Sequence, residues 1–215
     1  MSDSSEPKRK YNSTRRQAQA RETQNQILQA ARRLFVAHGY AGATIEAIAQ
    51  EAGVAPETVF ASFGNKRTIL TKLIDISVGG DDLPLSLMQR PSPQAVLHTA
   101  DPVRQLQLFA EDISHILARV APIFQVMRMA AKSEPDIADL LAGLLAQRLG
   151  NMTEFVQSLA GHSPLREGLD VMQAAEIVWG ITSPELYTLF TVDRGWSREA
   201  YGRWLADSLN RLLLP

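Results

Sequence analysis

The stretch "TIEAIAQEAGVAPETVFASFGNK", residues 44–66, decides the fold because it contains two short helical segments around a glycine turn. Thr44 is a favourable N-cap for the first segment, which Gly53 ends. Pro56 opens the second segment at a position where its missing N–H costs nothing, and Gly64 ends it. Isolated helices shorter than about 12 residues are marginal in water, so we expect both to be packed against a further helix.

The preceding segment supplies that helix. From residue 14 onward, apolar residues recur at spacings of three and four, which is typical of one buried helix face. The sequence "HGY" is expected to end this helix, with Gly39 left-handed and Tyr40 folded back onto the last turn. A helix, a glycine turn and a second short helix form a helix-turn-helix, whose second helix enters the major groove of DNA. The apolar residues of the first helix are Ile27, Ala30, Ala31, Leu34 and Phe35.

The second short helix has an outward face without Lys or Arg. If Val59, Phe60 and Phe63 face inward, base reading relies on hydroxyls, one carboxylate and apolar contacts with thymine methyl groups. Affinity then comes from phosphate contacts by the Thr44 hydroxyl, by Lys66 and by a basic N-terminal arm. A three-helix subdomain that binds no nucleic acid would give the same pattern. The outward residues are Pro56, Glu57, Thr58, Ala61 and Ser62.

Charge is distributed unevenly along the chain. Residues 1–75 hold 11 basic and 7 acidic side chains, net +4, whereas residues 76–215 hold 11 and 16, net −5. This asymmetry favours an N-terminal region that binds a polyanion, although a solvated basic tail would also produce it. We therefore expect a disordered basic arm over residues 1–13, a DNA-binding domain over residues 14–75 and a second domain over residues 76–215.

Composition limits the class of protein. The chain has 215 residues, of which 45% are hydrophobic and 21% charged, as in ordinary globular proteins. It contains no cysteine, which excludes disulfides, thiol nucleophiles and cysteine-ligated zinc. No apolar run approaches the roughly 18 residues of a membrane span, and the N-terminus lacks the apolar core of a signal peptide. We expect a cytoplasmic protein that does not enter a membrane.

The remainder of the chain has the pattern of an all-α fold. Residues 79–102 are rich in Gly and Pro and are typical of a long loop or a broken helix. Beyond them we find neither a strand pattern nor a repeat. Helices are expected over residues 101–118, 122–133, 135–160, 170–179 and 184–190, followed by a last helix that ends near residue 213.

The opening stretch also resembles a known family. The pattern T-I-E-A-I-A-x-x-A-G-V-A-x-x-T-V-F-x-x-F-x-x-K, preceded by A-x-x-L-F-x-x-x-G-Y, is similar to the DNA-binding domain of the TetR family of one-component transcriptional regulators. The likeness covers about residues 20–75. It implies an all-helical homodimer on a palindromic DNA operator, with a C-terminal domain that binds a small-molecule effector. By position, Thr44 and Lys66 would contact phosphates, and residues 55–62 would form the recognition helix.

Three positions depart from the family pattern. Ala55 stands where Ser is common, so N-capping is weaker and Pro56 must help. Phe60 stands where Tyr is common, which removes a hydroxyl often used on phosphate. His is frequent near Ala61 or Ser62, so this recognition surface is smaller and less polar than usual.

The C-terminal ending resembles the last two helices of one TetR subgroup, which implies pairing of these helices across a two-fold axis. The apolar residues that could form the pairing face are Ile177, Ile181, Leu186, Leu189, Trp204, Leu205, Leu209 and Leu212. An effector pocket would lie among the helices of residues 101–182. Its candidate residues, each of which could equally be ordinary core, are the apolar Phe109, Phe124, Met127 and Trp179 and the polar anchors His115 and Arg128.

Chemistry-bearing motifs are scarce. Glu111 and His115 share a helix face, but an ion pair or an effector contact explains them better than a metal. No nucleophile elbow, phosphate loop or nucleotide fingerprint occurs, so we expect no enzyme, metal or cofactor. We expect a ligand-responsive, DNA-binding transcriptional regulator that acts as a repressor. Two alternatives stay open: a helical small-molecule-binding or interaction protein with a degenerate helix-turn-helix, and an all-α enzyme.

Overall fold

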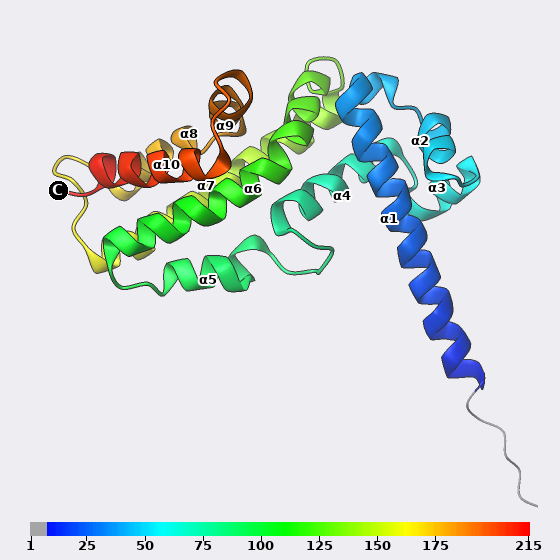
Figure 1. Cartoon of the computed structure of the whole chain (residues 1–215), viewed down its shortest axis with the longest axis horizontal. Helices are drawn as coiled ribbons and strands as arrows, with labels where there is room; N and C mark the ends of the chain where they lie inside the picture. Colours follow the sequence, from blue (N-terminus) through cyan, green and yellow to red (C-terminus); the bar gives the residue numbers. More distant parts are fainter. Residues whose placement is uncertain (1–7) are drawn as a thin grey trace, which may run out of the picture. The chain divides into compact units, whose positions relative to one another are not determined.

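The computed structural model describes residues 8–215, with side chains from residue 15 onward, and within this range it contains helices and no strand. The predicted all-α class is confirmed. The chain divides into two compact units, one up to Lys72 and one from Leu73 onward. The helices, labelled in Figure 1, are α1 (Lys8–Gly42), α2 (Ile45–Ala52), α3 (Pro56–Phe63), α4 (Lys66–Gly79), η1 (Leu87–Gln89), α5 (Pro91–Leu97), α6 (Pro102–Ala130), α7 (Pro135–His162), α8 (Val171–Ile181), α9 (Pro184–Thr188), η2 (Leu189–Asp193) and α10 (Arg198–Leu213).

The first unit is a small helical core. α2 packs on α1 and on α3, and α4 begins in the same unit. Each of these four helices contributes at least one fully buried apolar side chain. This burial stabilises α2 and α3, which are too short to be stable alone. The largest of these buried side chains are Ile27, Phe35, Ile48, Ile69 and Leu70.

Helix α1 differs from expectation at both ends. Residues 1–7 lie outside the described residues, and residues 8–13, expected to be disordered, form the first turns of α1. Gly39 has a positive φ of 70° as expected, but its ψ of 177° is extended rather than left-handed. The glycine therefore interrupts the helix, which continues to Gly42. Tyr40 folds back as predicted, with its ring stacked on Phe35 at a centroid distance of 5.7 Å.

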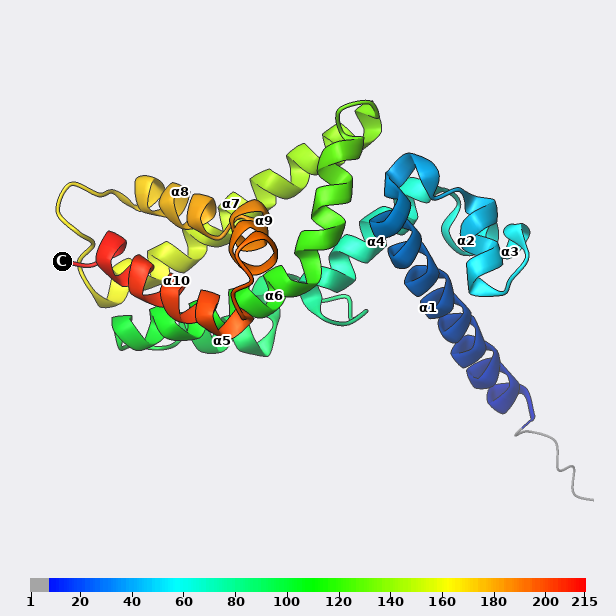
Figure 2. The same ribbon diagram turned by 45° about the horizontal axis from the view of Figure 1, so that its top comes forward.

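The second unit is arranged around α6. This helix packs against α5, α7, α9 and α10, and α8 lies on α7 (Figure 2). We expected Pro122 to start a new helix, and this was wrong, because α6 continues through it. Ala118, whose carbonyl loses its helical partner to the proline, and Pro122 itself are both exposed, so water can replace that bond. Burial of the flanking residues keeps the helix intact.

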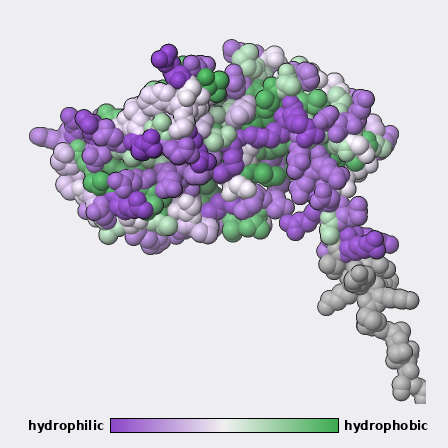
Figure 3. Space-filling model, viewed as in Figure 1, coloured by the Kyte–Doolittle hydropathy of each residue, from purple (hydrophilic) through white to green (hydrophobic). Residues whose placement is uncertain are grey.

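The segment between α4 and α6 is a broken helix, as its glycines and prolines indicated. It contains the single-turn helix η1 and the short helix α5, and the chain turns away from α4 at Gly80, which has a φ of 86°. Within the described residues no helix combines the length and apolarity needed to cross a membrane. Hydrophilic residues cover most of the face seen in Figure 3, and hydrophobic residues form separate patches there.

Candidate nucleic-acid interface and ligand site

Both ends of α2 are fixed by the residues that the sequence marked. The Thr44 hydroxyl accepts a hydrogen bond from the Ala47 N–H at 3.1 Å. Gly53 is left-handed, with φ 68° and ψ 31°, and the Val54 N–H donates to the Ala49 carbonyl at 3.0 Å. This pattern closes the helix with the bonds of a Schellman motif. It sets the direction in which α3 leaves the turn.

Helix α3 is anchored by Val59, its one buried side chain. Glu57 and Ala61 are exposed as expected. Phe60 belongs to the predicted DNA-contacting helix, but the argument for base reading assumed that it faces inward, and it is 51% exposed. The correction follows from helix geometry, because Val59 and Phe63 are four residues apart and share the inner face, while Phe60 is rotated by about 100°. Phe60 thus joins Glu57 and Ala61 on the outer face.

The other predicted contact residues frame this face. Ala55 is exposed at the N-cap of α3 and forms no side-chain cap, while Pro56, Thr58 and Ser62 are half-buried. Asn65 caps α4, since its Oδ1 accepts from the Thr68 N–H at 2.9 Å. The surface therefore offers two capped helix N-termini and a small recognition helix.

Lys66 is held within its own unit. Its ammonium donates to the Tyr40 carbonyl at 2.7 Å and lies 4.2 Å from the centroid of the Tyr40 ring. Its role as a phosphate contact stays a prediction, because the ammonium would have to share its protons or leave this site. The neighbouring Arg67 is exposed at the first turn of the same helix.

The six predicted effector residues do not converge on one cavity. Phe109 lines a narrow space that we call the apolar crevice, formed by η1, α5, α6 and α7 and enclosing about 30 Å³. Its ring stacks on Phe155 at 3.9 Å. The other residues of the apolar crevice are Leu87, Met88, Pro93, Val96, Leu97, Asp112, Ile113, Ile116, Asn151 and Met152.

His115 lies elsewhere, in an open groove of about 550 Å³ between α6 and α10 that Glu111 also lines. Arg198 Nη1 lies 3.1 Å from His115 Nδ1. Because a guanidinium can only donate, the imidazole accepts at Nδ1 in this contact. Arg198 also pairs with Glu199, so the groove is lined by charges that are partly neutralised by one another.

Phe124, Met127 and Arg128 belong to the second half of α6. Phe124 and Met127 are buried in the core. The Arg128 guanidinium lies 5.5 Å from the Phe124 ring centroid and forms an ion pair with Glu185 of α9. Arg128 therefore connects α6 to α9, and none of the three residues lines the apolar crevice.

Trp179 is covered by an arginine that the sequence did not single out. The Arg148 guanidinium lies 5.0 Å from the Trp179 ring centroid and donates to the Trp179 carbonyl and, at 2.8 Å, to the Thr182 hydroxyl. Burial lowers the pKa of Arg148 to about 10. An arginine within the apolar pattern of α7 was the available signal for this site.

The expected pairing face is only partly exposed. Leu205 and Leu209 have no exposed surface and belong to the core of the second unit, in which α10 packs along α6. Leu189 is 52% exposed, and its neighbour Val192 is 72% exposed. These two residues lie in η2, beside a cluster of aromatic rings formed by Phe190, Trp196, Tyr201 and Trp204.

Comparisons with known proteins agree with the opening helices. Residues 27–73 match the family model described as bacterial regulatory proteins, tetR family. The fatty acid metabolism regulator protein of Bacillus subtilis strain 168 is 27% identical over 191 residues, which cover 88% of this chain and 92% of that protein. The helix-turn-helix transcriptional regulator TcmR of Streptomyces glaucescens is 29% identical over 161 residues, 73% of this chain and 65% of that protein.

Solved structures share the fold over nearly the whole chain. The fatty acid degradation regulator FadR of Bacillus halodurans has a TM-score of 0.71 at 21% identity, covering 87% of this chain and 94% of that one. FadR of Bacillus subtilis in complex with stearoyl-CoA has a TM-score of 0.68 at 23% identity, covering 86% and 96%. The segment over residues 27–73 therefore matches the helix-turn-helix of the tetR family, and the chain has the fold of these solved regulators.

Proposed function

We propose that the protein is a homodimeric repressor that binds a palindromic operator in the cytoplasm and leaves it when a small molecule with a long alkyl chain binds the second unit. The proposal of DNA binding is supported mainly by the outer face of α3. Glu57, Phe60 and Ala61 are exposed on a helix whose entry angle is fixed by the capped turn at Gly53. A short, exposed helix held in this way is what the major groove accepts.

In the proposed interface, different residues supply sequence selectivity and affinity, as the distribution of charge indicates. Helix α3 contains no Lys or Arg, so it selects sequence without adding much affinity. Affinity would come from Arg67, from the capped helix N-termini at Thr44 and Asn65, and from the basic start of the chain.

The apolar crevice supports the class of effector. It is lined almost entirely by aliphatic, aromatic and methionine side chains, and Phe109 is among the residues predicted for it. The names of two similar proteins refer to fatty acid regulation, and one of them was solved with stearoyl-CoA. An alkyl chain is the ligand group that such a lining would accept.

Release from the operator requires that the two ligands prefer different states. We infer that the effector binds more tightly to a state in which the two recognition helices of the dimer no longer match successive major grooves, about 34 Å apart. Operator and effector then compete through one conformational equilibrium, and each weakens the binding of the other by the same factor.

The experiment starts with selection of bound sequences from random duplex DNA by the full-length protein. We expect a two-fold symmetric site whose affinity falls steeply with salt. Fluorescence anisotropy on that site, with and without stearoyl-CoA, then tests release. Failure to select any sequence, or selection that survives removal of residues 1–75, would contradict the DNA-binding proposal. Unchanged operator affinity with saturating bound stearoyl-CoA would contradict the release proposal.

A further inference from the structure

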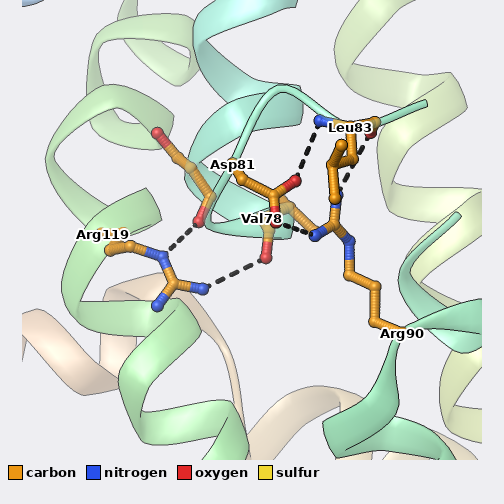
Figure 4. A network of polar contacts seen from close by, with 6 residues as sticks. Val78, Asp81, Leu83, Arg90 and Arg119 are labelled. Carbon is orange, nitrogen blue, oxygen red and sulfur yellow. Dashed lines mark hydrogen bonds and ion pairs between the residues drawn. The ribbon is translucent and has the colours of Figure 1, made fainter. Parts of the chain in front are cut away.

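The carboxyl end of α4 is covered by an arginine from α6. The last carbonyl groups of a helix have no helical partner and carry partial negative charge. Arg119 donates through Nε to the Ser77 carbonyl at 2.9 Å and through Nη2 to the Val78 carbonyl at 3.3 Å (Figure 4). One forked side chain therefore fixes α6 to the last turn of α4 within the second unit.

A second arginine packs against the same turn. Arg90, between η1 and α5, is buried, and its guanidinium donates to Asp81 at 2.9 Å and to the Leu83 carbonyl at 3.3 Å. A Cβ added to Gly79 would lie only 2.4 Å from Arg90 Nη2, so the guanidinium occupies the space that a side chain would need. The bonds from the Leu83 N–H and from Arg90 hold the pKa of Asp81 below its usual range.

Both arginines sit on elements that line the apolar crevice. Arg90 is two residues after Met88, and Arg119 is three residues after Ile116 on α6. Asp112, also in the lining, accepts a hydrogen bond from Ser92 at 2.6 Å and thereby joins α5 to α6. The apolar crevice encloses about 30 Å³, whereas small-molecule sites have about 300–1,000 Å³. A ligand can enter only if η1, α5, α6 or α7 moves. The first three of these elements carry or adjoin an arginine that packs against the end of α4.

The other end of α4 belongs to the first unit, where Lys66 donates to the Tyr40 carbonyl. We propose that Arg119 and Arg90 are the positioning residues that connect opening of the apolar crevice to displacement of α4, and hence to operator release. The inference rests on the proposed function. It adds the residues through which the two ligands influence each other, although neither arginine lines the apolar crevice.

The test compares four variants. Arg119→Gln removes the forked donor, and Gly79→Ala displaces Arg90 without altering any charge. Arg104→Gln, on the exposed side of the same helix α6, and Gly143→Ala, at a helical glycine with open space around it, are the matched controls. For each variant we would measure the dissociation constants of operator and of stearoyl-CoA separately, and then the operator constant at saturating stearoyl-CoA.

In the wild type we expect stearoyl-CoA to weaken operator binding by about tenfold or more, within the usual range of coupling between sites. Arg119→Gln and Gly79→Ala should reduce this factor to below about threefold while each separate affinity changes by less than about threefold. Both controls should keep the wild-type factor. The proposal is overturned if Arg119→Gln and Gly79→Ala couple the two ligands as strongly as the controls.

A second measurement needs neither operator nor effector, so it tests the role of Arg119 even if the proposed effector class is wrong. Because the chain lacks cysteine, Gln50→Cys and Asp139→Cys, both at exposed positions, allow a spin-label pair with one label in each unit. Arg119→Gln should broaden the distance distribution between the labels, and Arg104→Gln should not. If stearoyl-CoA does not bind but the distribution broadens, the effector class is wrong and the role of Arg119 stands. An unchanged distribution overturns that role.

Discussion

Lys66 and Tyr40 are joined twice, by a 2.7 Å hydrogen bond from the ammonium to the backbone carbonyl and by a 4.2 Å approach of the same ammonium to the ring. Tyr40 is itself stacked on Phe35, so the contact ties the start of α4 to α1. The Lys66 ammonium therefore stabilises the first unit whether or not it also contacts a phosphate.

Replacing Lys66 by Met should therefore destabilise the protein. Loss of one charge-assisted hydrogen bond and one cation–π contact in a half-buried setting predicts a decrease of about 1–2 kcal/mol in the free energy of unfolding. Urea denaturation followed by circular dichroism measures it. Arg67→Met is the matched control, because Arg67 is exposed on the next residue and its loss should change stability by less than about 0.5 kcal/mol.

The same two variants separate stability from DNA contact. If Arg67 binds a phosphate, Arg67→Met weakens operator binding and lowers the slope of log affinity against log salt concentration by about 1. Equal stability losses in both variants would show that the Tyr40 contact has no special importance.

Adding a hydroxyl to Phe60 should strengthen operator binding. The side chain is 51% exposed, so Phe60→Tyr costs the core little, and the new hydroxyl can donate to a phosphate. A gain of about 1 kcal/mol corresponds to roughly fivefold tighter binding, measured by anisotropy. Phe63→Tyr, on the inner face of the same helix, should not tighten binding. Weaker binding by Phe60→Tyr than by the wild type would place this ring away from the backbone of the DNA.

Filling the apolar crevice should block the effector and spare the operator. Ile113→Phe adds bulk to a space of about 30 Å³, so stearoyl-CoA binding should weaken at least about tenfold, with an overpacking cost of about 1–3 kcal/mol. Isothermal titration calorimetry measures the first effect. Ile123→Phe, in the core of the same helix and outside the apolar crevice, controls for the loss of stability. Equal loss of stearoyl-CoA binding in both variants would argue against the apolar crevice as the site.

A charge at Val192 should prevent pairing of two chains. This residue is 72% exposed beside Leu189, and Val192→Asp would place an unpaired carboxylate in an apolar contact. Sedimentation velocity should report a dimer for the wild type and monomers for the variant. Val103→Asp introduces the same charge at another exposed valine, 46% exposed on α6, and should leave the dimer intact. A dimeric Val192→Asp variant would exclude η2 from the interface.

Local features of the fold were predictable from the sequence because local chemistry fixes them. Thr44 and Gly53 act at the two ends of α2, where the side chain of the first and the backbone freedom of the second indicated. Phe60 was misplaced because an apolar residue on a short helix is expected to be buried, whereas here it lies on the face proposed to meet DNA. Pro122 was misjudged because burial on both sides outweighs the helix-breaking tendency of proline.

The residues of the proposed ligand site, the apolar crevice, were much harder to predict from the sequence. Phe109 is the one predicted effector residue that lines the apolar crevice, whose lining comes from four helices. Two of these helices, η1 and α5, lie in a segment expected to be a loop or a broken helix. Arg119 contacts backbone carbonyls 41 and 42 residues away, and a carbonyl has no signature in the sequence. Contacts of this kind follow from the packing of helices, which periodicity alone does not specify.

The small outer side chains of α3 have a consequence for the evolution of specificity. Val59 and Phe63 form the inner face of this helix, so Glu57, Ala61 and Ser62 can change to bulkier or differently polar residues with little thermodynamic penalty. If the protein reads DNA as proposed, its descendants can acquire new target promoters by substitutions at three codons, while the proposed phosphate contacts and the proposed effector site are inherited unaltered.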